Sequence, residues 1–87
     1  MNTYIVEFNV APSVPHALSG VLDDYCDSLE TVALSEEDAL KRIKNHLCAT
    51  FDSLGFIVDN DSDSIVVCYP NGVLTEKYSG FSVKSIE

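Results

Sequence analysis

The chain has 87 residues, of which 46% are hydrophobic, and its 14 carboxylates outnumber its 5 lysines and arginines to give a net charge of −9. This length and apolar content predict a single folded domain over residues 1–87 that buries a core without a metal or a disulfide framework. The charge argues against direct binding to nucleic acid or anionic membranes, and the lack of any long apolar run argues against a membrane span.

The first predicted element is a strand over residues 3–10. Its residues alternate between two faces, with Tyr4, Val6, Phe8 and Val10 on the same side, as expected for a half-buried strand. Residues 15–25 carry apolar residues at helical spacing around a central glycine. They are predicted as a short helix, with a long ordered loop as the alternative. Residues 29–34 form a predicted second strand that pairs with the first.

A long helix is predicted over residues 36–54. Ser35 is a suitable N-cap, acidic residues fill the first turn, and Gly55 fits the position that ends a helix. Its apolar stripe consists of Leu40, Ile43, Leu47, Phe51 and Leu54.

The remainder of the chain predicts a β-meander. Residues 56–58 and 64–69 are short apolar runs separated by a polar turn over 59–63. Residues 69–73 predict a hairpin with Gly72 in the left-handed position, and residues 73–78 return antiparallel. Gly80 interrupts the alternation that follows, which predicts a bulge or bend.

These elements predict an α+β fold. An antiparallel sheet of four to five strands carries the long helix on one face, and a short helix near 15–25 is optional. The helix stripe is expected to pack against core residues of the sheet, namely Tyr4, Val6, Phe8, Ile65, Val67 and Phe81.

No motif in the sequence predicts catalysis, a metal site or a cofactor. The acidic run over 59–63 resembles the opening of a calcium loop, but Ser64 and Pro70 stand where that loop needs glycine and glutamate. His46 and Cys48 point to different sides of the predicted helix and do not form a catalytic pair. A composite zinc site from Cys26, His46 and Cys68 is the alternative left open.

The cysteines and the start of the chain predict a cytoplasmic protein, in the host cytoplasm if it is phage-encoded. Cys26, Cys48 and Cys68 are odd in number and form no C-x-x-C motif, so we expect reduced and mostly buried thiols. The first residues lack the basic region of a signal peptide.

The strongest indication of function is the charge of the first forty residues. They contain no lysine or arginine and eight carboxylates: Glu7, Asp23, Asp24, Asp27, Glu30, Glu36, Glu37 and Asp38. If the carboxylates from Asp23 to Asp38 lie close together in the folded protein, they imitate a row of phosphates and attract a basic protein surface. The predicted partner-binding residues are Asp23, Asp24, Tyr25, Asp27, Glu30, Glu36, Glu37 and Asp38.

In format, the chain resembles the small acidic anti-defence proteins of phages and mobile elements, of the anti-CRISPR and anti-restriction type. The likeness lies in the short length, the negative balance, the strand over 4–10 and the strand-to-helix segment over 31–39. It implies a non-catalytic inhibitor of a nucleic-acid-handling protein, acting as a DNA mimic. The alternative is a structural or homo-oligomeric module, for example a homodimer, that uses an exposed strand edge.

Overall fold

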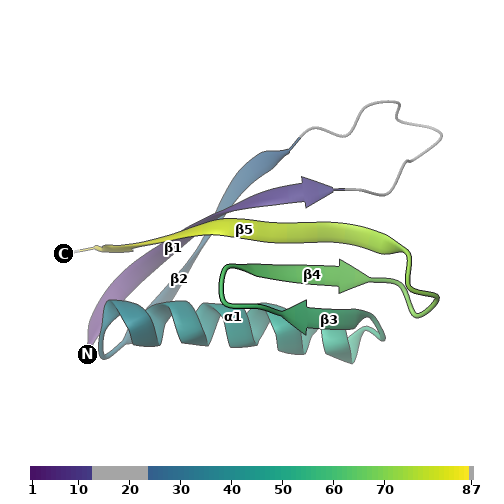
Figure 1. Cartoon of the computed structure of the whole chain (residues 1–87). Coiled ribbons are helices and arrows are strands. Elements are labelled where there is room, and N and C mark those ends of the chain that lie inside the picture. Colours follow the sequence, from purple (N-terminus) through teal and green to yellow (C-terminus); the bar gives the residue numbers. More distant parts are fainter. Residues whose placement is uncertain (13–23, 87) are drawn as a thin grey trace.

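One helix and five strands make up the part of the chain that the computed structural model describes, residues 1–12 and 24–86. In chain order they are β1 (Asn2–Pro12), β2 (Tyr25–Ala33), α1 (Glu36–Ser53), β3 (Ile57–Asn60), β4 (Ser64–Cys68) and β5 (Leu74–Ser85). The strands form one antiparallel sheet in the order β2-β1-β5-β4-β3, and α1 packs against one face of it (Figure 1). The predicted α+β fold is confirmed. Within the described ranges, no helix has the length and apolar character needed to cross a membrane.

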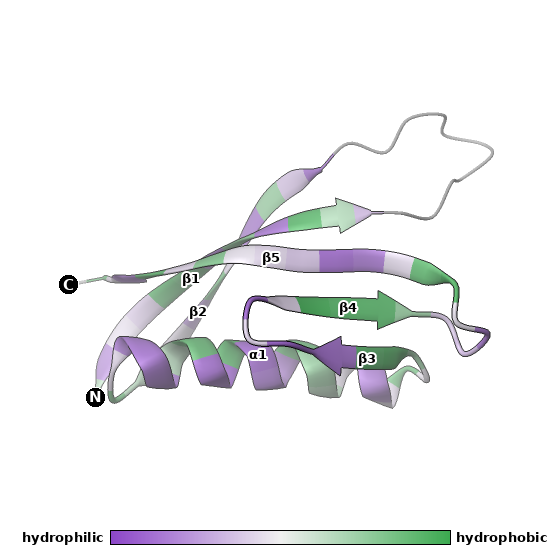
Figure 2. Ribbon diagram, viewed as in Figure 1, coloured by the Kyte–Doolittle hydropathy of each residue, from purple (hydrophilic) through white to green (hydrophobic). Residues whose placement is uncertain are grey.

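The core lies between α1 and the sheet. Alternate residues of β1 are buried toward the helix, and β4, which lies between β5 and β3, is almost continuously hydrophobic in Figure 2. The predicted sheet residues Tyr4, Val6, Phe8, Ile65 and Val67 are all buried. Phe81 is partly buried and packs against them. The alternation therefore predicted correctly which face of the sheet is covered.

The helix begins and ends for the reasons expected from the sequence. The Ser35 side chain accepts a hydrogen bond from the backbone N–H of Asp38 at 3.2 Å, which caps the first turn. Gly55 has a φ of 89° and allows the chain to leave the last turn. Leu54 is the C-cap and is exposed, so its predicted place in the buried stripe is wrong, because the helix ends before its side chain can reach the core.

The predicted irregularity at Gly80 is a β-bulge between β1 and β5. Glu7 pairs with Ser82 and Asn9 pairs with Ser79, so two residues of β5 stand opposite Phe8 alone. Gly80 has a φ of 65°, and a Cβ atom placed on it would lie 2.8 Å from Asn9 Nδ2. Only glycine meets both conditions without strain.

Two strand boundaries differ from the prediction. β2 begins at Tyr25 rather than residue 29, because its polar first half pairs in register with the end of β1. β3 includes Asp59 and Asn60, which were predicted as turn, because they pair with Val66 and Ile65. In both places cross-strand pairing outweighs unfavourable local composition. The predicted short helix or loop over 15–25 lies outside the described residues, except that Asp24 precedes β2 and Tyr25 begins it.

Candidate functional site

The candidate site is the outer edge of β2. Its inner edge pairs with β1 from Asn2–Ala33 to Val10–Tyr25, and no strand among the described residues pairs with its outer edge. We use the name acidic edge for β2 together with Asp24, which precedes it.

Two contacts show which backbone groups of β2 point away from the sheet. On β1, the Thr3 carbonyl accepts a hydrogen bond from the Ile86 N–H at 3.0 Å. The backbone N–H and C=O groups of the odd-numbered residues of β1 therefore point toward β5, and those of the even-numbered residues point toward β2. On β2, the Ser28 N–H donates to the Asp27 carboxylate at 2.8 Å instead of to β1. Both observations identify the same residues whose backbone N–H and C=O groups point away from the sheet: Cys26, Ser28, Glu30 and Val32.

The acidic edge is exposed and carries negative charge only. Asp24, Asp27 and Glu30 are all exposed, and residues 24–35 contain no lysine or arginine. Apolar side chains are exposed at both ends of the edge: Tyr25 and Val32 at 50% and Leu34 at 71%. A partner would therefore meet charge together with apolar anchors.

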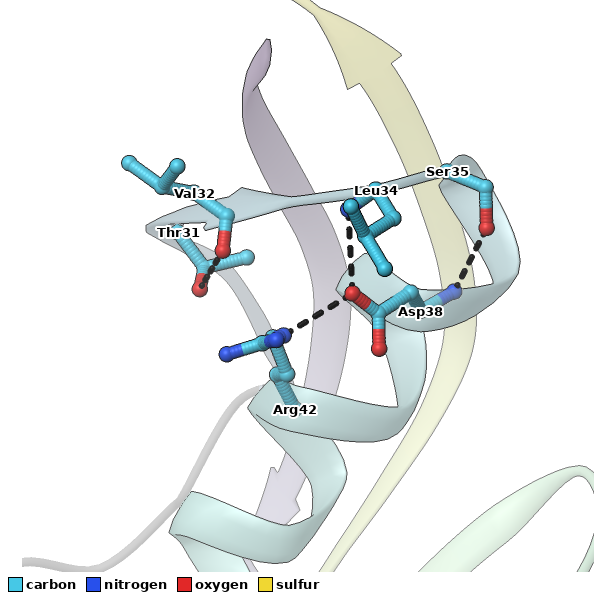
Figure 3. Close-up of polar contacts among 6 residues, drawn as sticks. All are labelled: Thr31, Val32, Leu34, Ser35, Asp38 and Arg42. Atoms are coloured by element: carbon cyan, nitrogen blue, oxygen red, sulfur yellow. Dashed lines mark hydrogen bonds and ion pairs between the residues drawn. The ribbon is translucent and has the colours of Figure 1, made fainter. Parts of the chain in front are cut away.

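The three carboxylates at the start of α1 lie on the helix rather than on β2, and one of them, Asp38, is hydrogen-bonded within the protein. Asp38 accepts hydrogen bonds from the Leu34 N–H at 3.0 Å and from Arg42 Nε at 2.9 Å (Figure 3). The bond from Leu34, followed by the bond and charge of Arg42, lowers the pKa of Asp38 below its usual value. Glu36 and Glu37 are exposed beside it. Asp38 thus fixes the turn between β2 and α1, while its two neighbours remain available.

The structure places the predicted binding residues in a row rather than in one compact patch. Asp24 and Ala33 lie at opposite ends of β2, roughly 30 Å apart at the usual rise of a strand. The carboxylates near residue 24 and those at the start of α1 therefore do not lie close together. The side chains of Asp27 and Glu30 also lie on opposite faces of the sheet, with Asp27 on the face that α1 covers and Glu30 on the face that α1 leaves open. Asp23 lies outside the described residues. Elsewhere, Glu7 forms an ion pair with Lys84 at 2.7 Å.

Lys44 is a charged residue that the sequence did not mark as special. It is 9% exposed, its Nζ donates to the Asp61 and Ser62 carbonyls at 2.6 and 3.3 Å, and it lies 5.6 Å from the centre of the Phe81 ring. These contacts tie the turn after β3 to the helix. A shallow groove of about 370 Å³ beside it is lined by Glu37, Leu40, Lys41, Lys44, Asn45 and Asn60.

The cysteines are free, but they are less buried than predicted. Cys26, on the edge strand β2, is exposed, and Cys48 and Cys68 are half-buried. Cys26 Sγ donates to Asn9 Oδ1 at 3.1 Å. Burial raises the pKa of Cys48, with a smaller opposing effect of Lys44. Among the described residues, no group of three histidine, cysteine or acidic side chains is arranged to hold a metal.

The outward backbone of Ser28 and Val32 was missed by the sequence analysis. Alternation shows which side chains share a face, but it does not show which strand lies at the edge of the sheet. Comparison of the chain with protein-family models, curated proteins and solved structures found no match.

Proposed function

We propose that this protein is a non-catalytic acidic binding protein that inhibits a basic nucleic-acid-handling protein. The observation that carries the proposal is the acidic edge, which has exposed carboxylates, no cation, and an outer side with which no described strand pairs. Such an edge presents a line of negative charge to a positively charged channel, as the small acidic anti-defence proteins that it resembles in format are expected to do.

The distribution of the cations supports this proposal. Arg42 in α1 forms an ion pair with Asp38, and Lys84 forms one with Glu7. Lys44 is held beneath the turn after β3. No ion pair among the described residues involves Asp24, Asp27 or Glu30, so none of these carboxylates is neutralised by a direct contact there.

Charge reversal along the edge tests the proposal. The natural protein and the double variant Asp27→Lys/Glu30→Lys are immobilised and exposed to bacterial lysate, and the retained proteins are identified. A retained protein is then assayed for binding to a labelled DNA duplex in the presence of each variant. We expect the natural protein to retain a basic protein and to displace its DNA, with an effect that weakens as salt is raised.

The matched control is Asp52→Lys/Asp59→Lys, which changes the net charge equally at exposed positions off β2. It should behave like the natural protein. Equal retention by the edge-reversed variant, or unchanged DNA binding by the retained protein, would reject the proposal.

A second candidate function is a homo-oligomeric module, and the open edge of β2 is the observation that favours it. Sedimentation of the natural protein separates the two. A stable oligomer that retains no other protein favours the module, whereas a monomer favours the inhibitor.

A further inference from the structure

The outer edge of β2, which no described strand pairs with, offers backbone groups as well as charge. The N–H and C=O groups of Cys26, Ser28, Glu30 and Val32 point outward by the register argued above. Two of them have weak or local partners: the Ser28 N–H donates to Asp27, and the Val32 carbonyl accepts from Thr31 Oγ1 at 3.5 Å. An edge of this kind is a template on which an extended segment can be added as a further strand.

The charge of the edge selects among the segments that could be added. A second copy of β2 would bring a second strand that carries Asp27 and Glu30 and no cation, so nothing on either strand would offset the repulsion between their carboxylates. The other edge strand, β3, carries Asp59 and is followed by Asp61, so a β2–β3 contact between copies meets the same repulsion. A basic segment of another protein meets no such cost.

We propose that the acidic edge binds an extended basic segment of its partner, which becomes a sixth strand beside β2. This inference rests on the proposed function and specifies how its partner is bound. Lysine or arginine side chains of the added strand lie near Asp27 and Glu30. Its apolar side chains lie toward Val32, which is half exposed.

Asp27 has a specific role in this arrangement. In the free protein its carboxylate accepts the Ser28 N–H at 2.8 Å and so covers one outward donor of the edge. A partner carbonyl takes over that N–H when a basic side chain draws the carboxylate away. One donor of the edge is thereby withheld from a neutral strand and released to a cationic one.

The test uses a blocked valine heptapeptide with lysines at its second and fifth positions, which lie on opposite faces of an extended strand as Asp27 and Glu30 do on β2. The same peptide with glutamates at those two positions is the charge control. We expect the basic peptide to slow amide hydrogen exchange at Cys26, Ser28, Glu30 and Val32. Exchange at Asp27, Leu29 and Thr31 should stay unchanged, because these amides already face β1. The glutamate–valine peptide should have no effect.

Two variants of Ser28 separate the contribution of its backbone N–H to peptide binding from that of its side chain. Ser28→Pro removes an outward N–H without removing a bond to β1, and Ser28→Ala keeps that N–H. We expect Ser28→Pro to bind the lysine–valine peptide roughly tenfold more weakly and Ser28→Ala to bind it within about twofold of the natural protein. If Ser28→Pro does not fold, the exchange pattern of the natural protein decides.

The outcomes distinguish strand addition from the proposed function. Peptide binding that Asp27→Lys/Glu30→Lys abolishes, but that neither slows exchange at the outward amides nor responds to Ser28→Pro, would overturn strand addition and leave the charge-based inhibitor standing. Peptide binding that neither Asp27→Lys/Glu30→Lys nor Ser28→Pro weakens would count against both strand addition and the charge-based inhibitor.

Discussion

Asp38 connects the start of α1 to the end of β2 through its own charge. The same carboxylate oxygen accepts the Leu34 N–H and Arg42 Nε, while the Asp38 backbone N–H is capped by Ser35 (Figure 3). This arrangement is a variant of the capping box in which the carboxylate reaches the residue before the cap. One side chain therefore sets the angle at which the helix leaves the acidic edge.

The lowered pKa of Asp38 makes a pH-dependent prediction. Because its pKa is lower in the folded than in the unfolded protein, the ionised carboxylate favours folding at pH values above about 3.8, its unperturbed value. We expect Asp38→Asn to be less stable than the natural protein near neutral pH. This difference should shrink as the pH falls below that value through the folded pKa, as measured by thermal unfolding at a series of pH values. A difference that is constant across this range would contradict the assignment.

Lys44 offers a second prediction for a single side chain. Lys44→Met keeps most of the apolar stem but removes the charged group that donates to the turn after β3. Since hydrogen bonds from charged donors contribute about 1.5–3 kcal/mol, we expect a loss of about that size in the free energy of unfolding in urea. The control is Lys41→Met, an exposed neighbour that should change stability by less than about 0.5 kcal/mol. Equal effects of the two substitutions would show that the Lys44 contacts contribute little.

At the scale of elements, the bulge at Gly80 fixes how β5 follows β1. We expect Gly80→Ala to destabilise the protein by about 1–3 kcal/mol, because alanine is strained at positive φ and its Cβ would approach the Asn9 amide. Asn9→Ala removes the amide but leaves the backbone strain. The double variant Asn9→Ala/Gly80→Ala should therefore recover part of the free energy of unfolding that Gly80→Ala loses, as measured in urea. Complete recovery would mean that the positive φ of residue 80 does not contribute to the destabilisation.

The elements differ in how far local sequence determines them. The helix, the hairpin at Gly72 and the bulge at Gly80 were predicted because caps, apolar periodicity and positive-φ glycines act within a few residues. The first half of β2 was missed because Asp27 is disfavoured in strands and its neighbours show no apolar alternation; pairing with β1 holds this part of the strand in place. The candidate site was predicted only as a set of charges, since its geometry depends on β2 lying at the edge, which is a property of the whole sheet.

For the whole molecule, negative charge at both sheet edges has a consequence besides partner selection. Unpaired strands promote edge-to-edge association, and proteins commonly oppose it with charged residues. β2 has Asp27 and Glu30, and β3 has Asp59. The same carboxylates that attract a basic segment therefore disfavour contact between two copies of this chain.

Neutralising the acidic edge should therefore promote self-association. We expect Asp27→Thr/Glu30→Thr to self-associate at concentrations where the natural protein sediments as a monomer, because threonine favours strands and the Ser28 N–H loses its intramolecular acceptor. The control Glu37→Thr/Asp52→Thr removes the same charge from the exposed surface of α1 and should remain monomeric. Self-association of both variants to the same extent would indicate that net charge alone keeps the copies apart. If neither variant associates, the carboxylates of β2 are not what protects its edge.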